Sequence, residues 1–227
     1  MSGKLYLPEP MHSLLGGIDH GALTNFYGAP GTGKTNLCLM LSIECIKNGG
    51  KVIYVDTEGG FSPERVAQLT PEAENALRNI SIVEPKDFKE QGGIIRNLHK
   101  MEADLIIVDS AAALYRLEYA DPDKEALEAS RELGKQMAVL SSIAREKKIP
   151  VIITSHTYKD WETERNEIVG GDSLKYWSKV MVFLERTGKM AERSATITKH
   201  RWMPEGKTVK FVITEDGIKP SGGFKLF

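Results

Sequence analysis

The sequence predicts an α/β fold with a mainly parallel central sheet, flanked by helices, and antiparallel strands at its C-terminal end. Up to residue 156, short β-rich runs alternate with helical patterns, which is typical of βαβ units and a parallel sheet. From residue 179 onward, three strand-like runs follow one another through short connections, which indicates antiparallel pairing. Because no linker-like stretch interrupts this order, residues 1–227 are expected to form one domain.

The first half of the chain predicts a strand, a helix, a second strand and a second helix. Residues 22–28 have the apolar pattern of a strand, and apolar residues at helical spacing follow over 32–48 until a glycine pair ends them. A continuous apolar run predicts a buried strand over 51–57. Ser62 then supplies an N-cap hydroxyl, and Pro63 fits the first turn of the next helix.

The second half continues the alternation before the pattern changes. Strands are predicted over 79–85 and 104–110, with a helical stretch over 87–101 between them. A long helix is predicted from about residue 124 to 147, followed by a buried strand over 149–156. The antiparallel strands that complete the sheet are expected over 179–187, 193–201 and 208–217.

The composition favours a folded, cytoplasmic protein. The chain is 41% hydrophobic and 27% charged, which suits a globular core, and its formal net charge is −1. Residues 175–227 contain 11 Lys and Arg against 5 Asp and Glu, which fits either local phosphate contacts or solvated surface lysines. No apolar run approaches the roughly 18 residues that span a bilayer. Cys38 and Cys45 are about 10 Å apart along the predicted helix, so buried reduced thiols are expected.

A glycine-rich motif between the first strand and the first helix predicts a phosphate-binding loop. It matches G-x-x-x-x-G-K-[ST] in full, through Gly28, Ala29, Pro30, Gly31, Thr32, Gly33, Lys34 and Thr35, with Asn36 following. The glycines allow backbone N–H groups to approach an oxyanion, and the helix directs its positive end at the same point. Lys34 is expected at the β- and γ-phosphates, and the Thr35 hydroxyl is expected on Mg²⁺.

Two carboxylates follow neighbouring apolar strands and complete the predicted site. Asp109 ends the run Leu-Ile-Ile-Val-Asp, which places it at the edge of a parallel sheet where ligands bind, so it is expected to hold Mg²⁺ through water. Glu58 follows the strand after the phosphate loop, where a carboxylate can orient and polarise an attacking water. The alternative for Glu58 is a residue that only caps the loop.

Four segments in this order resemble the core of the RecA-like strand-exchange recombinases. They are the phosphate loop, YVDTEGGFSPER, LIIVDSAAALYR and PVIITSH, within a match over about residues 14–219. The chain is more similar to the eukaryotic and archaeal recombinases than to the bacterial ones. Only about a dozen residues precede the core, without the N-terminal helical DNA-binding domain or the Phe-x-x-Ala peptide, so the chain resembles core-only archaeal paralogues.

This resemblance implies roles for individual residues. It makes Glu58 the carboxylate that activates water, and it places the Arg65 guanidinium on the adenine ring of ATP. Pro204 matches the segment that caps the nucleotide of a neighbouring subunit. Lys199 is expected to reach the γ-phosphate in trans, unless it is a solvated lysine at a strand end. His156 stands where recombinases usually have the glutamine that senses the γ-phosphate.

The resemblance also implies two DNA-facing loops, here at about 117–124 and 157–172. Arg116 matches a basic residue at the foot of the first loop, and Trp161 in the second could stack on a base or anchor a packing contact. Both loops carry more acidic than basic residues, which opposes binding to a phosphodiester backbone. Weak DNA contact and little strand exchange are therefore expected.

The leading interpretation is an ATP-binding recombinase paralogue in homologous recombination and DNA repair. It would bind ATP and Mg²⁺, hydrolyse ATP slowly, and act as a mediator or regulator of the main RadA-type recombinase. Other recombination proteins, DNA and a second copy of the chain are its expected partners, in the cytoplasm at the nucleoid. The alternatives are a fully active strand-exchange recombinase, a signalling or clock-type ATPase that handles no DNA, and a nucleotide-gated interaction module with negligible turnover.

Overall fold

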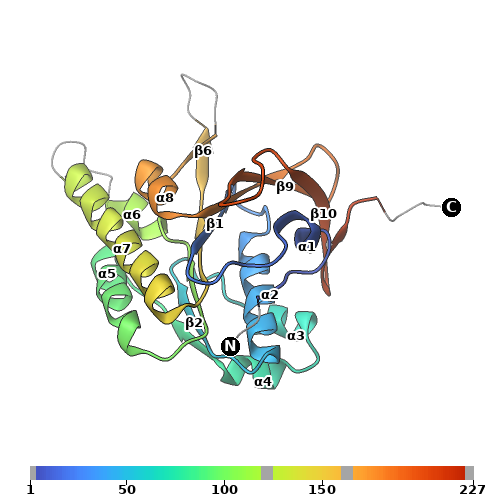
Figure 1. Cartoon of the computed structure of the whole chain (residues 1–227), viewed down its shortest axis with the longest axis horizontal. Helices are drawn as coiled ribbons and strands as arrows, with labels where there is room; N and C mark the ends of the chain where they lie inside the picture. The colour runs from blue at the N-terminus through green and yellow to red at the C-terminus, as the bar shows by residue number, and fades with distance from the viewer. Residues whose placement is uncertain (1–3, 119–124, 160–165, 223–227) are drawn as a thin grey trace.

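The fold was analysed in a computed structural model, which describes residues 4–118, 125–159 and 166–222. A nine-stranded sheet runs through the molecule in the order β11-β10-β9-β8-β1-β5-β4-β2-β3, and a separate two-stranded sheet pairs β6 with β7. Figure 1 shows helices on both sides of the large sheet. This confirms the predicted α/β class, with its mainly parallel sheet and antiparallel C-terminal strands.

The strand bounds agree closely with the apolar runs of the sequence. The strands of the large sheet are β1 (Leu23–Gly28), β2 (Val52–Asp56), β3 (Ile80–Val83), β4 (Leu105–Asp109), β5 (Val151–Ser155), β8 (Val180–Arg186), β9 (Glu192–Lys199), β10 (Thr208–Thr214) and β11 (Gly217–Pro220). The six strands from β8 to β3 in sheet order pair in parallel, and β8 through β11 pair antiparallel in succession. The carboxyl ends of β1, β5, β4 and β2 therefore meet at one edge of the sheet.

Two helical layers cover the faces of the sheet. One hydrophobic cluster packs beneath α1 (Met11–Leu15), α2 (Lys34–Lys47), α3 (Pro63–Leu69) and α4 (Ala73–Arg78). On the other face, a second cluster packs beneath α5 (Phe88–Asn97), the 3-10 turn Leu98–Lys100, α6 (Ala113–Glu118), α7 (Glu125–Lys147) and α8 (Gly171–Trp177). In Figure 1, α2, α3 and α4 lie on one side of the sheet, and α5, α6 and α7 lie on the other.

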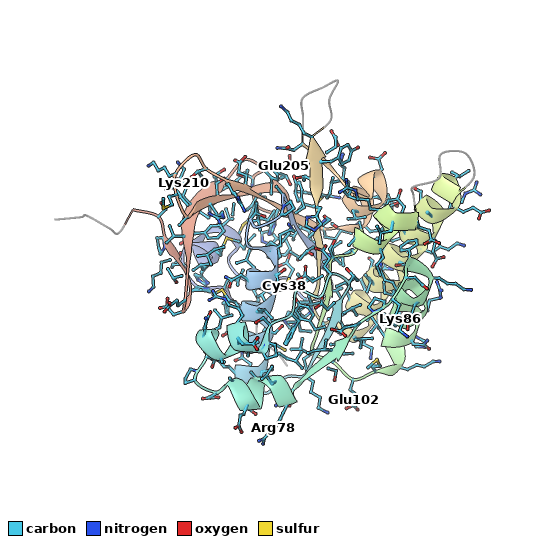
Figure 2. The ribbon with its side chains drawn as sticks, turned by 180° about the vertical axis from the view of Figure 1, so that it is seen from behind. Cys38, Arg78, Lys86, Glu102, Glu205 and Lys210 are labelled. Carbon is cyan, nitrogen blue, oxygen red and sulfur yellow. The ribbon has the colours of Figure 1, made fainter. Side chains whose placement is uncertain are left out.

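Several local predictions are confirmed at the level of single contacts. The Ser62 hydroxyl accepts a hydrogen bond from the Arg65 N–H at 3.0 Å and begins α3, with Pro63 at its first position. Cys38 and Cys45 are buried free thiols on α2, and burial raises the pKa of Cys45 to about 12. Figure 2 shows Cys38 in the middle of the molecule, whereas Arg78, Lys86, Glu102 and Lys210 lie towards its periphery.

The structure adds elements that the sequence patterns do not show. The short helices α1, α4, α6 and α8 and the strand β11 had no prediction of their own. The segment expected as a polar loop over 157–172 contains β6 (Thr157–Lys159) and β7 (Asn166–Ile168), which pair antiparallel before α8. Elements of three to seven residues contain too few periods for a sequence pattern to identify them. Among the described residues, no helix is long and apolar enough to cross a bilayer.

Candidate nucleotide-binding site

The predicted phosphate loop lies between β1 and α2, and its glycines occupy positions that other residues could not adopt without strain. Gly28, Gly31 and Gly33 have φ angles of 156°, 73° and 102°. A Cβ atom on Gly28 would lie 2.0 Å from the Leu184 carbonyl oxygen. The Thr32 hydroxyl donates to the Ala29 carbonyl at 2.8 Å and closes the turn. The exposed Ala29, Pro30 and Gly31 form its tip, so the backbone forms an open cradle at the N-terminus of α2.

Lys34 is buried at the base of this cradle. Its ammonium donates to the Gly28 carbonyl at 2.9 Å and to the Ala29 carbonyl at 3.0 Å. Burial lowers the pKa of Lys34, while the nearby Asp109 and Glu58 carboxylates oppose that shift. The structure thus brings together the lysine, the proposed metal ligand and the proposed base, as the sequence predicted.

Asp109 ends β4 beside the cradle, where its carboxylate is fixed by two hydroxyl groups. Tyr54 donates to Oδ2 at 2.7 Å, and Thr154 donates to Oδ1 at 2.5 Å. Burial raises the pKa of the Tyr54 phenol well above its usual value, so it stays protonated as a donor. Thr35 lies in the first turn of α2. A carboxylate and a hydroxyl are oxygen ligands of the kind that Mg²⁺ prefers, so Asp109 and Thr35 suit Mg²⁺ held partly through water.

Glu58 follows β2 and is held by His156, which follows β5. The two carboxylate oxygens lie 2.8 and 2.9 Å from His156 Nε2, and the opposite ring nitrogen, Nδ1, lies 3.4 Å from the Lys34 ammonium. The hydrogen bond from His156 lowers the pKa of the Glu58 carboxyl, while burial opposes this shift. The role of His156 in this geometry could not be predicted from the sequence, because 98 residues separate it from Glu58.

Asp56 organises the loop that carries Glu58, and sequence reasoning missed it. Its carboxylate accepts backbone hydrogen bonds from Glu58 at 3.1 Å, Gly60 at 3.1 Å and Phe61 at 2.8 Å. An aspartate at a strand end that is followed three residues later by a glycine pair is a recognisable turn signal. Asp56 therefore fixes the backbone that presents Glu58.

Arg65 connects α3 to the phosphate-loop helix and to the turn after β10. Its guanidinium donates twice to the Asn36 side-chain oxygen, at 2.9 and 2.7 Å, and once each to the carbonyls of Thr214 and Glu215, at 2.7 and 2.8 Å. A fifth hydrogen bond reaches Gln68 at 2.8 Å. These bonds use the edges of the guanidinium plane, and stacking on a base would use its face. Asn36, expected at the nucleotide, here orients Arg65.

Two arginines that the sequence analysis did not single out also lie at the phosphate loop. Arg186 at the end of β8 and Arg193 on β9 are cross-strand partners. Arg193 donates to the Gly31 carbonyl at 3.1 Å, and a Cβ on Gly31 would lie 2.3 Å from the Arg186 guanidinium. Gly31 is thus favoured chiefly by its backbone angle, and a side chain there would also displace the Arg186 guanidinium. Only the pairing of β8 with β1 brings these charges to the loop.

Lys199 and Pro204 lie away from the phosphate loop of their own chain. Lys199 ends β9 and pairs with Met181, near the start of β8, whereas Gly28 is level with Leu184 near its end. Three strand residues correspond to about 10 Å along the sheet. The Lys199 ammonium donates to the Lys175 carbonyl at 2.6 Å, and burial together with Lys179 lowers its pKa. Pro204 is exposed in the loop between β9 and β10.

The residues expected at DNA are only partly described. Arg116 is exposed on α6 and lines a cavity of about 460 Å³ with Tyr158 and Asp172. Trp161 and residues 119–124 of the first loop lie outside the described residues, so their predicted contacts stay predictions.

Comparison with known proteins identifies relatives over almost the whole chain. A family model described as Rad51 matches residues 9–221. The chain is also similar to proteins named "DNA repair and recombination protein RadB". The one from Methanococcoides burtonii is 43% identical, and the match covers 93% of this chain and 95% of that protein. The one from Methanosphaera stadtmanae is 40% identical, and the match covers 89% of each chain. The solved structure titled "Crystal structure of the RadB recombinase" matches with a TM-score of 0.79 and 38% identity, over 92% of this chain and 96% of its own.

The sequence similarity, the matching fold and the phosphate-loop site agree with one another, and they confirm the expected resemblance to an archaeal recombinase paralogue. The chain belongs to the Rad51 family and, within it, to the group of archaeal RadB proteins.

Proposed function

We propose that this protein is a nucleotide-dependent mediator of homologous recombination and DNA repair that binds ATP with Mg²⁺ and hydrolyses it slowly. The observation that carries the proposal is the meeting of Lys34, Glu58 and Asp109 at one sheet edge beside the phosphate loop. The names of the relatives support the setting in DNA repair and recombination. Residues 1–227 would act as one RecA-like ATPase domain, in the cytoplasm at the nucleoid.

The residues suggest how hydrolysis would proceed. The loop N–H groups and Lys34 bind the β- and γ-phosphates, and Arg65 stacks on the adenine. Glu58 takes a proton from water as the water oxygen bonds to the γ-phosphorus and the bond to ADP breaks, which gives ADP and phosphate. Thr35 and Asp109 would hold Mg²⁺, which neutralises charge on the phosphates when bound.

The positions of Lys199 and Pro204 support the proposal that turnover is slow. Both lie away from the phosphate loop of their own chain, so they can reach a nucleotide only in a neighbouring copy. Such an arrangement is a head-to-tail contact between subunits. The isolated chain would bind ATP with an incomplete site, and assembly with itself or with the main recombinase would complete it.

DNA contact is proposed as weak and secondary to contact with the recombinase. The two loops at 117–124 and 157–172 contain eight acidic residues against three basic ones, so counterion release on DNA would be small. Arg116 and Trp161 are the residues proposed to touch DNA. This balance favours a mediator over a fully active strand-exchange recombinase.

The test measures ATPase rate and affinity for single-stranded DNA over a salt series, with and without the partner recombinase. We expect a slow basal rate that rises with the partner, and a shallow salt dependence of DNA affinity. Glu58→Gln should abolish hydrolysis and spare ATP binding, because the amide keeps its size but cannot accept the proton. Turnover retained in Glu58→Gln would refute the assigned base. An ATPase rate that changes with neither DNA nor the recombinase would instead support a signalling-type ATPase. ATP binding without measurable hydrolysis would support a nucleotide-gated module.

A further inference from the structure

One imidazole lies between the lysine of the phosphate loop and the proposed base. His156 Nδ1 is 3.4 Å from the Lys34 ammonium, and Nε2 is 2.8 and 2.9 Å from the two oxygens of Glu58. Lys34 begins α2 after the phosphate loop, and His156 and Glu58 follow β5 and β2, so the chain Lys34–His156–Glu58 crosses the sheet edge. At 22% exposed, the His156 side chain is largely enclosed, and both ring nitrogens are engaged.

The partners on each side determine the tautomer of His156. An ammonium group carries only donors, so Nδ1 must accept from Lys34, and Nε2 must therefore carry the hydrogen that it donates to Glu58. The backbone supports this orientation, because the His156 carbonyl accepts the Val169 N–H at 2.9 Å after the β6–β7 pair.

The same contact keeps Glu58 from acting as a base. A carboxylate that accepts a hydrogen bond at 2.8 Å is less basic, and the pKa of Glu58 is lowered mainly by this bond. Lys34, in turn, is bound to the Gly28 and Ala29 carbonyls, which it must leave to bind phosphate. A phosphate at Lys34 therefore removes the donor that Nδ1 faces and offers the imidazole a second anionic acceptor.

We propose that His156 is a positioning residue that retains Glu58 in the nucleotide-free protein and releases it when a γ-phosphate engages Lys34. Phosphate binding and availability of the base then depend on one side chain. This inference rests on the proposed ATPase function for its consequence, but its structural part concerns the nucleotide-free chain alone.

The first test is spectroscopic and needs no catalysis. The full-length chain is labelled with ¹⁵N-histidine, and the His156 signal is assigned by its loss in His156→Gln. We expect the Nε2–H tautomer without nucleotide, a clear change of the signal with magnesium adenylyl imidodiphosphate, and no such change with MgADP, which lacks the γ-phosphate. An Nδ1–H tautomer, or a signal that is indifferent to the triphosphate analogue, would overturn the proposal. A protein that binds ATP but never hydrolyses it would still give the expected spectra, so failure of the ATPase function can be told apart from failure of this inference.

The second test separates kcat from KM. His156→Ala should lower KM for ATP about five-fold, the factor that one hydrogen bond of ordinary strength represents, and change kcat less than two-fold, because the γ-phosphate releases Glu58 in the wild type as well. His99→Ala is the matched control, because this exposed histidine bonds only its own turn through the Arg96 carbonyl. A fall in kcat of ten-fold or more in His156→Ala, with unchanged thermal stability, would show that the imidazole acts on the substrate directly and would refute a retaining role.

Discussion

Arg65→Ala is the substitution that best separates a structural role from a nucleotide contact. Arg65 donates five hydrogen bonds: two to Asn36 on the phosphate-loop helix, two to the carbonyls of Thr214 and Glu215, and one to Gln68. Through them the guanidinium connects three segments that are distant in sequence. If it also stacks on adenine, its loss should weaken binding of the base without disturbing the phosphate cradle.

The magnitudes can be worked out from these contacts. A typical hydrogen bond contributes about 0.5–1.5 kcal/mol net, but Arg65 is partly exposed, so water can satisfy part of what is lost. We therefore expect the free energy of unfolding to fall by about 2–3 kcal/mol, and Tm by about 4–12 °C for a domain of this size. Loss of a cation–π contact of about 1–2 kcal/mol would weaken ATP binding about 5- to 30-fold.

The assay compares the affinity for MgATP with that for magnesium tripolyphosphate, which lacks the adenosine. Arg65→Ala should weaken ATP binding by the factor above and change tripolyphosphate binding less than two-fold. Arg65→Lys keeps the charge but loses the planar fork, so it should show the same loss for ATP. Arg78→Ala, which removes an exposed ion pair with Glu74, is the control and should change stability by less than about 0.5 kcal/mol. Equal losses for both ligands would mean that the effect runs through Asn36, and the stacking role would be wrong.

Two other predictions concern the pH dependence of folding and the completion of the ATPase site by a neighbouring subunit. The buried Asp19 has a pKa raised above its usual 3.8, chiefly by burial, so the free energy of unfolding should fall as pH rises through that raised pKa. In thermal melts, Asp19→Asn should therefore raise Tm at pH 7 and lose this advantage below about pH 3.8. A gain that is independent of pH would contradict this account. Lys199→Ala and Lys34→Ala should each lack ATPase activity in assembled protein, whereas an equimolar mixture of the two should recover about a quarter of the wild-type ATPase sites. The reason is that a head-to-tail contact can pair the intact Lys34 of one variant with the intact Lys199 of the other. A mixture that stays inactive would exclude action in trans.

Local patterns in the sequence determined the fold class and the members of the phosphate site. The phosphate loop, Glu58 and Asp109 could all be found because each belongs to a short segment: a glycine motif or an apolar run that ends in a carboxylate. In a parallel sheet, all such segments end at the same edge, so strand ends predict proximity without any knowledge of strand order. The buried cysteines followed from helical spacing, and the Ser62 cap followed from the residue types at the start of its helix.

Only the tertiary structure decided which of these residues touch. His156 meets Glu58 because β5 and β2 flank β4 in the sheet, and Arg186 reaches Gly31 because β8 pairs with β1. The direction of β9 places Arg193 at the phosphate loop and Lys199 away from it, although a sequence reading shows both only as basic residues on one strand. Strand order and direction depend on burial and pairing between segments that are far apart in the chain, and these long-range energies leave no periodic trace in the sequence.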